Sequence, residues 1–184
     1  MRVLGIAGSL RRDSHNRRLL RAAADLLPPG AELVEFDGLK TIPPFDEDDE
    51  HFPQRAVLAL HEAIAEADAV LFATPEYNSS IPGVLKNAVD WASRLKVAAP
   101  LANKPAAVIG ASTGMFGAVW AQAELRKVLG AAGARVIDRE LPVAGADEAF
   151  DGDGRLADRD LEVELGGILA ELVAAAEARG LVAA

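Results

Sequence analysis

Hydrophobic and polar positions are arranged along this chain in two different ways. Short segments rich in Val, Ile, Leu and Ala predict buried strands, whereas longer segments with apolar residues three or four positions apart predict amphipathic helices. The predicted strands are 2–7, 32–36, 69–74, 106–111 and 135–137, and the predicted helices are 16–27, 54–67, 82–95, 118–132 and 158–179. Because predicted strands and helices alternate along the chain, the pattern is typical of a parallel sheet with helices packed against it.

The third predicted strand indicates how the sheet is covered. Its sequence, AVLFAT, has almost no polar position, and a strand without polar alternation is covered on both faces. Helices on both sides of a parallel sheet make a three-layer α/β/α, doubly wound fold, and we expect five parallel strands in the flavodoxin-like order 2-1-3-4-5. With 184 residues and 51% hydrophobic content, the chain is expected to form a single domain over residues 1–184.

Composition and charge narrow the possible partners. The formal net charge is -9, so most of the surface repels a polyanion, and we expect neither nucleic-acid nor membrane binding. No apolar run approaches the roughly 20 residues of a membrane-spanning helix, and the start MRVLGIAG has no cleavable signal pattern. The chain contains no cysteine, which fits a reducing compartment, so a cytoplasmic location is expected.

Ligands of doubly wound sheets bind in loops at the carboxyl ends of the strands, and the first such loop, GSLRRDSHN, has the chemistry for a small anion. It offers hydroxyls at Ser9 and Ser14, an amide at Asn16, and a guanidinium at Arg11 or Arg12. A helix that begins there points free N–H groups outward, which favours a phosphate. Alternatively, Ser14 is only the helix N-cap, and the arginines form a solvated, salt-bridging face.

Other features of this segment limit the interpretation. The later arginines, Arg17, Arg18 and Arg21, fall on the predicted helix, where they can pair with acidic neighbours. The loop does not complete the dinucleotide fingerprint GxGxxG, and the chain has no GxxxxGK[ST] motif. A dinucleotide Rossmann site and a P-loop NTPase are therefore disfavoured.

The loop TPEYNSSIPG follows the buried third strand and is elaborate for a connector. Its prolines restrict the backbone, while Tyr77, Asn78 and the peptide groups supply stacking area and hydrogen bonds suited to the edge of a planar polar ring. A simpler interpretation is an ordered loop that leads into a Pro-initiated helix. The third loop, GASTGMFGAVW, has small residues that let the backbone approach a ligand. Taken alone it is weak evidence, because glycine-containing turns between a strand and a helix are common in α/β folds.

Taken in this order and spacing, the three loops resemble the NADPH-dependent FMN reductase family of flavodoxin-like proteins, which includes flavin, quinone, azo-dye and chromate reductases. The resemblance rests on GSLRRDSHN, on PEYNSSIPGVLKNAVDW, and on STGMFG with AQAELRKVL, and it spans residues 8–129. The second segment is the most specific. The resemblance implies a noncovalent FMN, NADPH or NADH as co-substrate, and ping-pong hydride transfer to a small-molecule acceptor such as a quinone, azo dye, nitroaromatic, chromate or free flavin.

The resemblance also implies the site residues. The FMN phosphate would be bound by Ser9, Arg11, Ser14 and Asn16, the isoalloxazine edge would meet Pro75, Glu76, Tyr77 and Asn78, and Ser112 and Gly114 would line the other side. Because the flavin carries the chemistry, we expect no catalytic side chain and no metal, and we interpret Glu76 as a residue that orients the loop or its backbone. Members of the family form homodimers, and we expect a homodimer or a tetramer built from two dimers.

One departure concerns the third loop, where family members often have a second glycine and then an arginine. Here Ala118 and Trp120 stand at those positions, so the preference between NADPH and NADH stays open. Trp120 either packs between subunits, lies beneath the flavin ring, or belongs to the core. Trp91, on the helix after the second loop, is either a core residue or part of a dimer interface.

Other chemistry-bearing residues are interpreted as structural. The acidic run 46–50 is typical of a solvated loop rather than a metal cluster, and His15, His51 and His61 lack the spacing of a metal or catalytic set. Two alternative functions remain. A flavodoxin-type electron carrier would bind FMN without oxidising a pyridine nucleotide, but its usual phosphate loop has no arginine. A phosphoacceptor signalling domain needs acidic residues where this chain has Gly8, Ser9 and Thr74.

Overall fold

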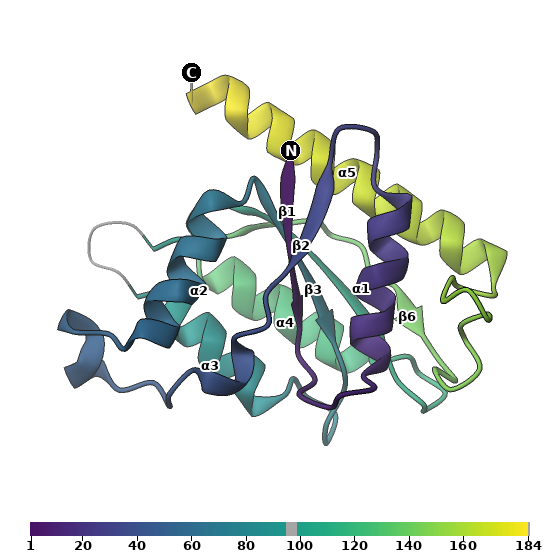
Figure 1. Cartoon of the computed structure of the whole chain (residues 1–184), viewed down its shortest axis with the longest axis horizontal. Coiled ribbons are helices and arrows are strands. Elements are labelled where there is room, and N and C mark those ends of the chain that lie inside the picture. Colours follow the sequence, from purple (N-terminus) through teal and green to yellow (C-terminus); the bar gives the residue numbers. More distant parts are fainter. Residues whose placement is uncertain (95–98, 184) are drawn as a thin grey trace.

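The computed structural model describes residues 1–94 and 99–183. Within them, strands and helices take turns as the hydrophobic pattern predicts (Figure 1). The strands are β1 (Arg2–Ala7), β2 (Glu32–Glu35), β3 (Ala69–Thr74), β4 (Pro105–Ala111), β5 (Arg135–Val136) and β6 (Pro142–Val143). The α-helices are α1 (His15–Leu26), α2 (Arg55–Glu66), α3 (Gly83–Ala92), α4 (Val119–Ala131) and α5 (Arg159–Ala183), and the 3-10 helices are η1 (Leu39–Thr41) and η2 (Glu47–His51).

The sheet is parallel, with the order β2-β1-β3-β4-β5, which confirms the predicted topology. The structure adds a sixth strand to the five that were predicted. The short strand β5 pairs with the start of β4, where Arg135 lies opposite Pro105, and β6 pairs with the end of β4, where Pro142 lies opposite Gly110. The edge next to β4 is therefore one interrupted line of two short strands, and the predicted strand 135–137 is only its first part.

Helices cover both faces of the sheet, as the apolar third strand predicted. Helices α1 and α5 pack on one face, and α2, α3 and α4 pack on the other (Figure 1). Every residue of β3 is buried, and its side chains alternate between the two hydrophobic cores, with Leu71 in one and Phe72 in the other. The fold is therefore a three-layer α/β/α arrangement around a central β3.

Local sequence signals explain where the helices begin and end. Helix α1 begins after Ser14, whose side chain accepts a hydrogen bond from the Arg17 N–H, and it ends before Leu27, which is extended because Pro28 follows it. The helix predicted at 82–95 begins one residue later, at Gly83, and ends at Ala92. The predicted end at residue 95 lies outside the described residues. The other predicted helices agree with the structure at most ends to within one residue.

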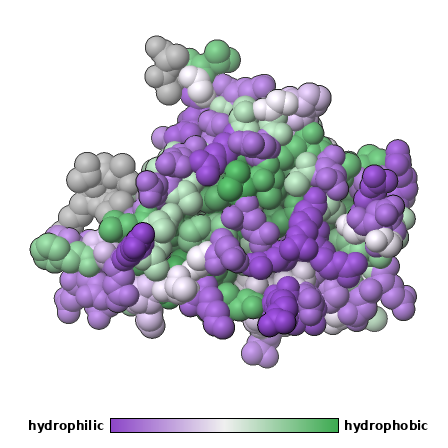
Figure 2. All heavy atoms as spheres, in the orientation of Figure 1, coloured by the Kyte–Doolittle hydropathy of each residue, from purple (hydrophilic) through white to green (hydrophobic). Residues whose placement is uncertain are grey.

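Most of the face shown in Figure 2 is hydrophilic, in keeping with the net charge of -9. In residues 1–94 and 99–183, no helix has the length and apolar character needed to cross a membrane. The same described residues contain no group of three or more His, Cys, Asp or Glu side chains arranged to bind a metal ion, and the acidic run at 46–50 forms the cap and body of η2.

Candidate functional site

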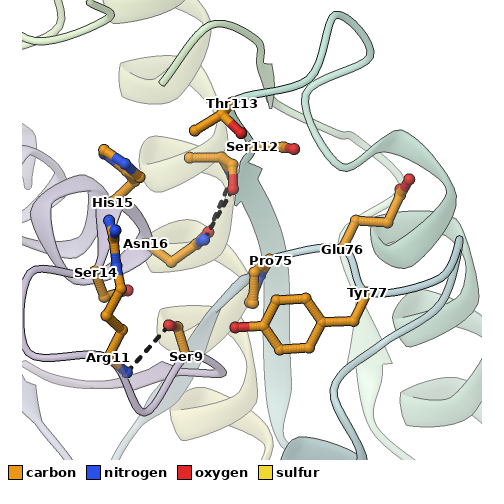
Figure 3. A pocket seen from close by; sticks show the side chains of 11 residues that line it. Ser9, Arg11, Ser14, His15, Asn16, Pro75, Glu76, Tyr77, Ser112 and Thr113 are labelled. Atoms are coloured by element: carbon orange, nitrogen blue, oxygen red, sulfur yellow. Dashed lines mark hydrogen bonds between the residues drawn. The ribbon is translucent and has the colours of Figure 1, made fainter. Parts of the chain in front are cut away.

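A cleft of about 260 Å³ lies at the carboxyl ends of β1, β3 and β4. The loops that follow these three strands, together with the first turn of α1, form its walls (Figure 3). This is where ligands bind in doubly wound sheets. The cleft is lined by Ser9, Arg11, Ser14, His15, Asn16, Pro75, Glu76, Tyr77, Ala111, Ser112 and Thr113.

The cleft brings together most of the residues that the sequence analysis selected. Eight of the ten predicted contacts line it, namely Ser9, Arg11, Ser14, Asn16, Pro75, Glu76, Tyr77 and Ser112. The other two, Asn78 and Gly114, lie next to it in the chain but outside its lining. Three lining residues, His15, Ala111 and Thr113, were not predicted. The contacts of these residues with a ligand stay a prediction.

Gly8 lets the first and second loops pack directly on each other. Its N–H donates to the carbonyl of Ala73 at 2.8 Å. A Cβ at this position would lie 2.9 Å from Leu85 Cδ2 and 3.2 Å from Pro75 Cδ, so a larger residue would require Leu85 to move and would crowd Pro75. Glycine therefore eases this close approach, and the backbone hydrogen bond joins two walls of the cleft.

The first loop presents hydrogen-bond donors to the cleft. The Arg11 N–H donates to Ser9 Oγ at 3.3 Å, and the Arg11 side chain reaches the carbonyl of Asp13 at 2.6 Å. Ser14 accepts the Arg17 N–H at 3.3 Å, so the N-cap interpretation is confirmed, but its O–H remains available as a donor. Within the described part of the chain, no hydrogen bond uses the backbone N–H of either first helical residue, His15 or Asn16. This end of the cleft is suited to an anion.

Asn16 joins α1 to β4. Its side chain is 2% exposed, and its amide donates to the carbonyl of Ala111 at 2.9 Å while it accepts the N–H of the same residue at 2.9 Å. This paired hydrogen bond holds the start of α1 against the end of β4 (Figure 3). The side chain expected to contact a phosphate is thus committed to the scaffold, with one amide hydrogen and its backbone N–H left for a ligand.

The later arginines have partners away from the cleft. Arg17 forms ion pairs with Glu35 and Asp37, and Arg18 lies 4.6 Å from the centre of the Phe150 ring. The prediction that these residues belong to the outer face of the helix is confirmed. Arg11 alone among the arginines discussed lines the cleft.

The second loop is a tight hairpin. Tyr77 and Ser80 exchange two backbone hydrogen bonds, at 3.0 and 3.1 Å. Between them, Asn78 and Ser79 have positive φ angles of 53° and 59°, a conformation that asparagine tolerates well. Asn78 is therefore at the exposed tip, whereas the Tyr77 ring lies across the mouth of the cleft with its hydroxyl toward Ser9 (Figure 3).

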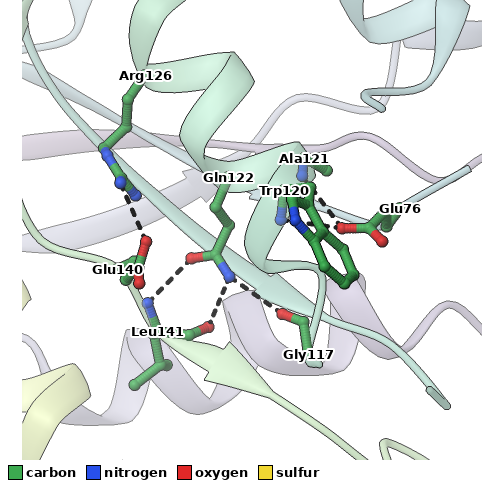
Figure 4. A network of polar contacts seen from close by, with 8 residues as sticks. All are labelled: Glu76, Gly117, Trp120, Ala121, Gln122, Arg126, Glu140 and Leu141. Carbon is green, nitrogen blue, oxygen red and sulfur yellow. Dashed lines mark hydrogen bonds and ion pairs between the residues drawn. The ribbon is translucent and has the colours of Figure 1, made fainter. Parts of the chain in front are cut away.

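Glu76 caps helix α4 from the second loop. Helix α4 begins after Ala118, which has a φ of 61° and provides no capping side chain. The Glu76 carboxylate accepts the N–H groups of Trp120 and Ala121, both at 3.1 Å (Figure 4). A negative charge is favourable at a helix N-terminus. The prediction that Glu76 orients backbone is confirmed, and the backbone that it orients belongs to α4.

The third loop is fixed by close packing against β6. Gly117 has a φ of 55°, and a Cβ there would lie 2.3 Å from the carbonyl carbon of Pro142, so only glycine fits. The buried side chain of Gln122 donates to the carbonyls of Gly117 and Leu141 and accepts the Leu141 N–H (Figure 4). These contacts hold the interrupted edge of the sheet beside the cleft.

Large apolar side chains are exposed next to the cleft. They are Tyr77, Met115, Phe116 and Trp120, all at least 48% exposed. The rings of Phe116 and Trp120 pack edge to face, with centroids 4.9 Å apart. Trp120 is therefore not a core residue, whereas Trp91 is 1% exposed and donates to the carbonyl of Pro43. The core interpretation holds for Trp91 only.

His15 was predicted to be a surface or packing residue, but it lines the cleft. Its Nε2 lies 3.2 Å from Asp147 Oδ1, in the loop after β6. That loop could not be anticipated because β6 was not predicted. The available signal was the position of His15 directly after the N-cap, where a side chain borders the space in front of the helix.

Comparisons with known proteins show the family to which the chain belongs. Residues 1–148 match the model of the family described as NADPH-dependent FMN reductase. The chain belongs to that family. It is 47% identical over 161 residues to an NAD(P)H-dependent FMN reductase of Pseudomonas aeruginosa, with 86% of this chain and 85% of that protein covered. Family membership confirms the predicted class, an FMN-dependent NAD(P)H oxidoreductase.

This FMN reductase family member is also similar to a quinone reductase and to a flavoenzyme of known structure. A 2-hydroxy-1,4-benzoquinone reductase from Burkholderia is 45% identical over 131 residues, which cover 70% of this chain and 69% of that protein. The solved structure of FerB, a flavoenzyme NAD(P)H:(acceptor) oxidoreductase from Paracoccus denitrificans, superposes with a TM-score of 0.83 at 36% identity. The match covers 96% of this chain and 97% of FerB.

Proposed function

We propose that the cleft binds FMN and that the protein uses it to pass reducing equivalents from NADH or NADPH to a small-molecule acceptor. Ser9, Arg11, Ser14 and the start of α1 at Asn16 would bind the phosphate. The loop of Pro75, Glu76, Tyr77 and Asn78 would meet one edge of the ring system, and Ser112 and Gly114 would lie along the other side. When bound, FMN supplies two-electron redox chemistry that accepts a hydride from a reduced nicotinamide and delivers the electrons to the acceptor.

The donor set at the first loop is the observation that carries this proposal. The free N–H groups of His15 and Asn16, the hydroxyls of Ser9 and Ser14, and the Arg11 guanidinium surround one end of the cleft. Arginine and a helix N-terminus are the partners that a phosphate prefers. The other end offers the peptide groups of a rigid hairpin and the ring of Tyr77, which suit a planar polar ring. The residues present therefore fit FMN.

The residues of the chain would bind and orient rather than react. The chain has no cysteine, and the carboxylate of Glu76 is occupied by the N–H groups of α4. The Gly8 contact and the Asn16 pair fix the spacing between the anion end and the ring end of the cleft. We therefore assign no acid, base or nucleophile to the protein.

Quinones are the acceptor class that we propose. The Burkholderia relative is named for the reduction of a benzoquinone. The side chains of Tyr77, Phe116 and Trp120 are exposed beside the cleft, and planar apolar compounds pack well against such rings. An open cleft with aromatic neighbours is suited to a flat acceptor that enters after the nicotinamide leaves.

The test of the proposed function is spectroscopic. The purified protein is scanned for the visible absorbance of flavin after incubation with FMN, and it is then mixed anaerobically with NADPH and separately with NADH. We expect binding of FMN and loss of the flavin absorbance with at least one nucleotide, followed by its return when a benzoquinone is added. Failure to bind FMN would contradict the proposal, whereas binding without bleaching by either nucleotide would favour the electron-carrier alternative.

A homodimer, or a tetramer built from two dimers, is also part of the proposal. The cleft is only about 260 Å³, below the roughly 300 Å³ where small-molecule sites begin. Exposed Met115, Phe116 and Trp120 border it, and contiguous exposed apolar side chains are typical of an interface. A second copy that covers them would complete the site. Light scattering of the wild type and of Trp120→Ser would test this, because the substitution is expected to weaken assembly; a monomeric wild type would contradict it.

We propose a cytoplasmic location as well. A chain without cysteine and with a nicotinamide co-substrate fits a reducing compartment that contains these nucleotides. Fractionation of cells that express the protein from its own promoter is expected to recover it with cytoplasmic markers. Recovery with an exported fraction would refute this location.

A further inference from the structure

Among the residues that the structure describes, Glu76 is the only charged one that lines the cleft at the end proposed for the ring. Arg11 lines the opposite end, where the phosphate is proposed to bind (Figure 3). Because Glu76 belongs to the lining, a planar group that fills this end lies within one side-chain length of its carboxylate. The other residues that line the ring end carry no formal charge, and they are Pro75, Tyr77, Ser112 and Thr113.

The same carboxylate lies at the positive end of α4. Its Oε2 accepts the N–H groups of Trp120 and Ala121, both at 3.1 Å (Figure 4). A helix N-terminus is equivalent to about half a positive elementary charge, so the full negative charge of the carboxylate outweighs it. With Glu76 in place, the ring end of the cleft is therefore net negative, and without it the end of the helix would make it positive.

A second carboxylate of this region, that of Glu124, has different surroundings. It accepts the Ser80 hydroxyl at 2.6 Å, so it contacts the same hairpin that carries Glu76. Glu124 is exposed and lies outside the lining of the cleft, and the solvent therefore screens its charge. Glu76 is partly buried, and a charge acts more strongly on a neighbouring group when a ligand has displaced the water between them.

We propose that Glu76 lowers the reduction potential of the bound cofactor and so makes its reduced form a stronger electron donor to the acceptor. This inference rests on the proposed function. A hydride brings two electrons and one proton, so the ring gains one negative charge on reduction, and a nearby carboxylate disfavours that charge. Charge near the ring is one of the means by which a protein tunes a flavin. Glu76 thus has an electrostatic role in addition to its role as the cap of α4.

The experiment measures the midpoint potential of FMN bound to the wild type and to Glu76→Gln. The bound flavin is equilibrated anaerobically with a reference dye at slightly alkaline pH, where the reduced ring keeps its negative charge. At a given solution potential, we expect the ratio of reduced to oxidised cofactor to be roughly tenfold higher in the variant, which is about 30 mV for a two-electron couple. Glu76→Ala removes the same charge from the same position, so it is a second neutral variant and should give a similar shift.

Two controls separate the charge of Glu76 from its structural role. Glu76→Asp keeps the negative charge on a shorter side chain, so the cap of α4 is weakened while the potential is expected to stay close to that of the wild type. Glu124→Gln removes an exposed carboxylate beside the same hairpin, and we expect a much smaller shift than for Glu76→Gln because solvent screens that charge. Thermal melting of each variant without flavin reports the loss of the cap separately.

The possible outcomes distinguish this inference from the proposed function. An unchanged or more negative potential in the two neutral variants would overturn the inference while FMN binding stands. The same positive shift in Glu76→Asp would also overturn it, because the effect would then come from the cap, and an equal shift in Glu124→Gln would assign it to the general charge of the surface. If the wild type binds no FMN, the proposed function fails first, and the effect of Glu76 on the potential fails with it.

Discussion

Three arginines near the start of α1 have the same side chain and different surroundings. Arg11 lines the cleft beside Ser9, whereas the guanidinium of Arg17 is paired with two carboxylates and that of Arg18 is stacked on Phe150. Arg11 donates to the carbonyl of Asp13 and, within the residues that the structure describes, to no carboxylate, so its charge is available to an anionic ligand, whereas that of Arg17 is already paired. The cluster in the sequence therefore separates into one candidate ligand contact and an ordinary helix face.

The first prediction follows from this division. Arg11→Ala is expected to weaken FMN binding roughly tenfold or more, because a hydrogen bond to a charged group contributes about 1.5–3 kcal/mol. Arg17→Ala and Arg18→Ala are matched controls that remove the same charge from the same region and should leave the FMN dissociation constant within about twofold. Fluorescence titration of the three variants measures this. Equal losses would show that the effect is the general field of the basic segment and not a contact of Arg11.

At the scale of elements, the start of α4 depends on residues from outside the helix. Glu76 supplies the cap from the second loop, and Gln122 joins the first turns to the segment before β6. These contacts tie the loop after β3, the loop after β4 and the edge of the sheet into one unit (Figure 4). Damage to any one of them is expected to reach the cleft as well as the fold.

Glu76→Ala is predicted to destabilise the protein by about 1 kcal/mol, the typical effect of losing a helix cap. Glu76→Gln keeps an acceptor but loses the charge at the helix N-terminus, so about half of that loss is expected. Urea denaturation of the apoprotein measures both. As a control, Glu124→Gln changes an acidic residue of α4 that accepts the Ser80 hydroxyl and no helix N–H among the described residues, and it should have less effect. A loss for Glu76→Ala no larger than this control would argue against the capping role.

Gly117→Ala is predicted to destabilise the protein by at least about 2 kcal/mol, because it combines a left-handed backbone with a clash. The new Cβ would lie 2.3 Å from the Pro142 carbonyl carbon at a φ of 55°. Gly83→Ala is the matched control, since a Cβ there meets nothing within 4 Å, and it should stabilise α3 by about 0.4–1 kcal/mol. Melting curves of the two variants should therefore move in opposite directions. Similar shifts would contradict the argument from close packing.

These elements also mark the limit of prediction from the sequence. The apolar strands β1 and β3 were predicted with the bounds that the structure gives, because a continuous run of apolar residues marks each buried strand. The break between β5 and β6 was not predicted, since it depends on Gln122 and Gly117, which meet that segment only in the folded chain. Most of the proposed ligand contacts were selected from the polar and small residues of the loops that follow the strands.

His15 escaped prediction for the same physical reason. Its partner Asp147 is distant in the sequence, and no periodicity connects the two residues. Asn16 was selected for the cleft, but its bond to Ala111 could not be foreseen. A residue's place is set by its local pattern, whereas its partners are set by the packing of the whole chain.

At the scale of the whole molecule, the sheet has the candidate cleft at one end and a buried lysine at the other. Lys104 lies just before β4, is 2% exposed, and donates to the carbonyls of Ala65 and Ala67 at the end of α2. These carbonyls have no partner inside their own helix. Burial lowers the pKa of Lys104 to about 8, with Arg179 acting in the same direction and Asp68 opposing it. The fold therefore disfavours the charged form of this side chain.

The sign of the resulting pH dependence follows from proton counts. The usual pKa of 10.5 applies to Lys104 in the unfolded chain, and about 8 applies in the folded one. Between these values the unfolded state binds more protons, so the contribution of Lys104 to the free energy of unfolding rises with pH. The whole rise is on the order of a few kcal/mol, at about 1.4 kcal/mol for each pH unit of separation.

Lys104→Met tests this prediction because methionine fills a similar volume and does not titrate. The difference in the free energy of unfolding, wild type minus Lys104→Met, is expected to increase between about pH 7 and pH 10. Lys127→Met is the matched control, since it removes an exposed lysine of α4, and its difference should stay flat over the same range. Urea denaturation at several pH values gives all three curves. A flat difference for Lys104→Met would mean that the carbonyls of α2 keep the ammonium charged in the fold, so that its burial has no effect on the pKa.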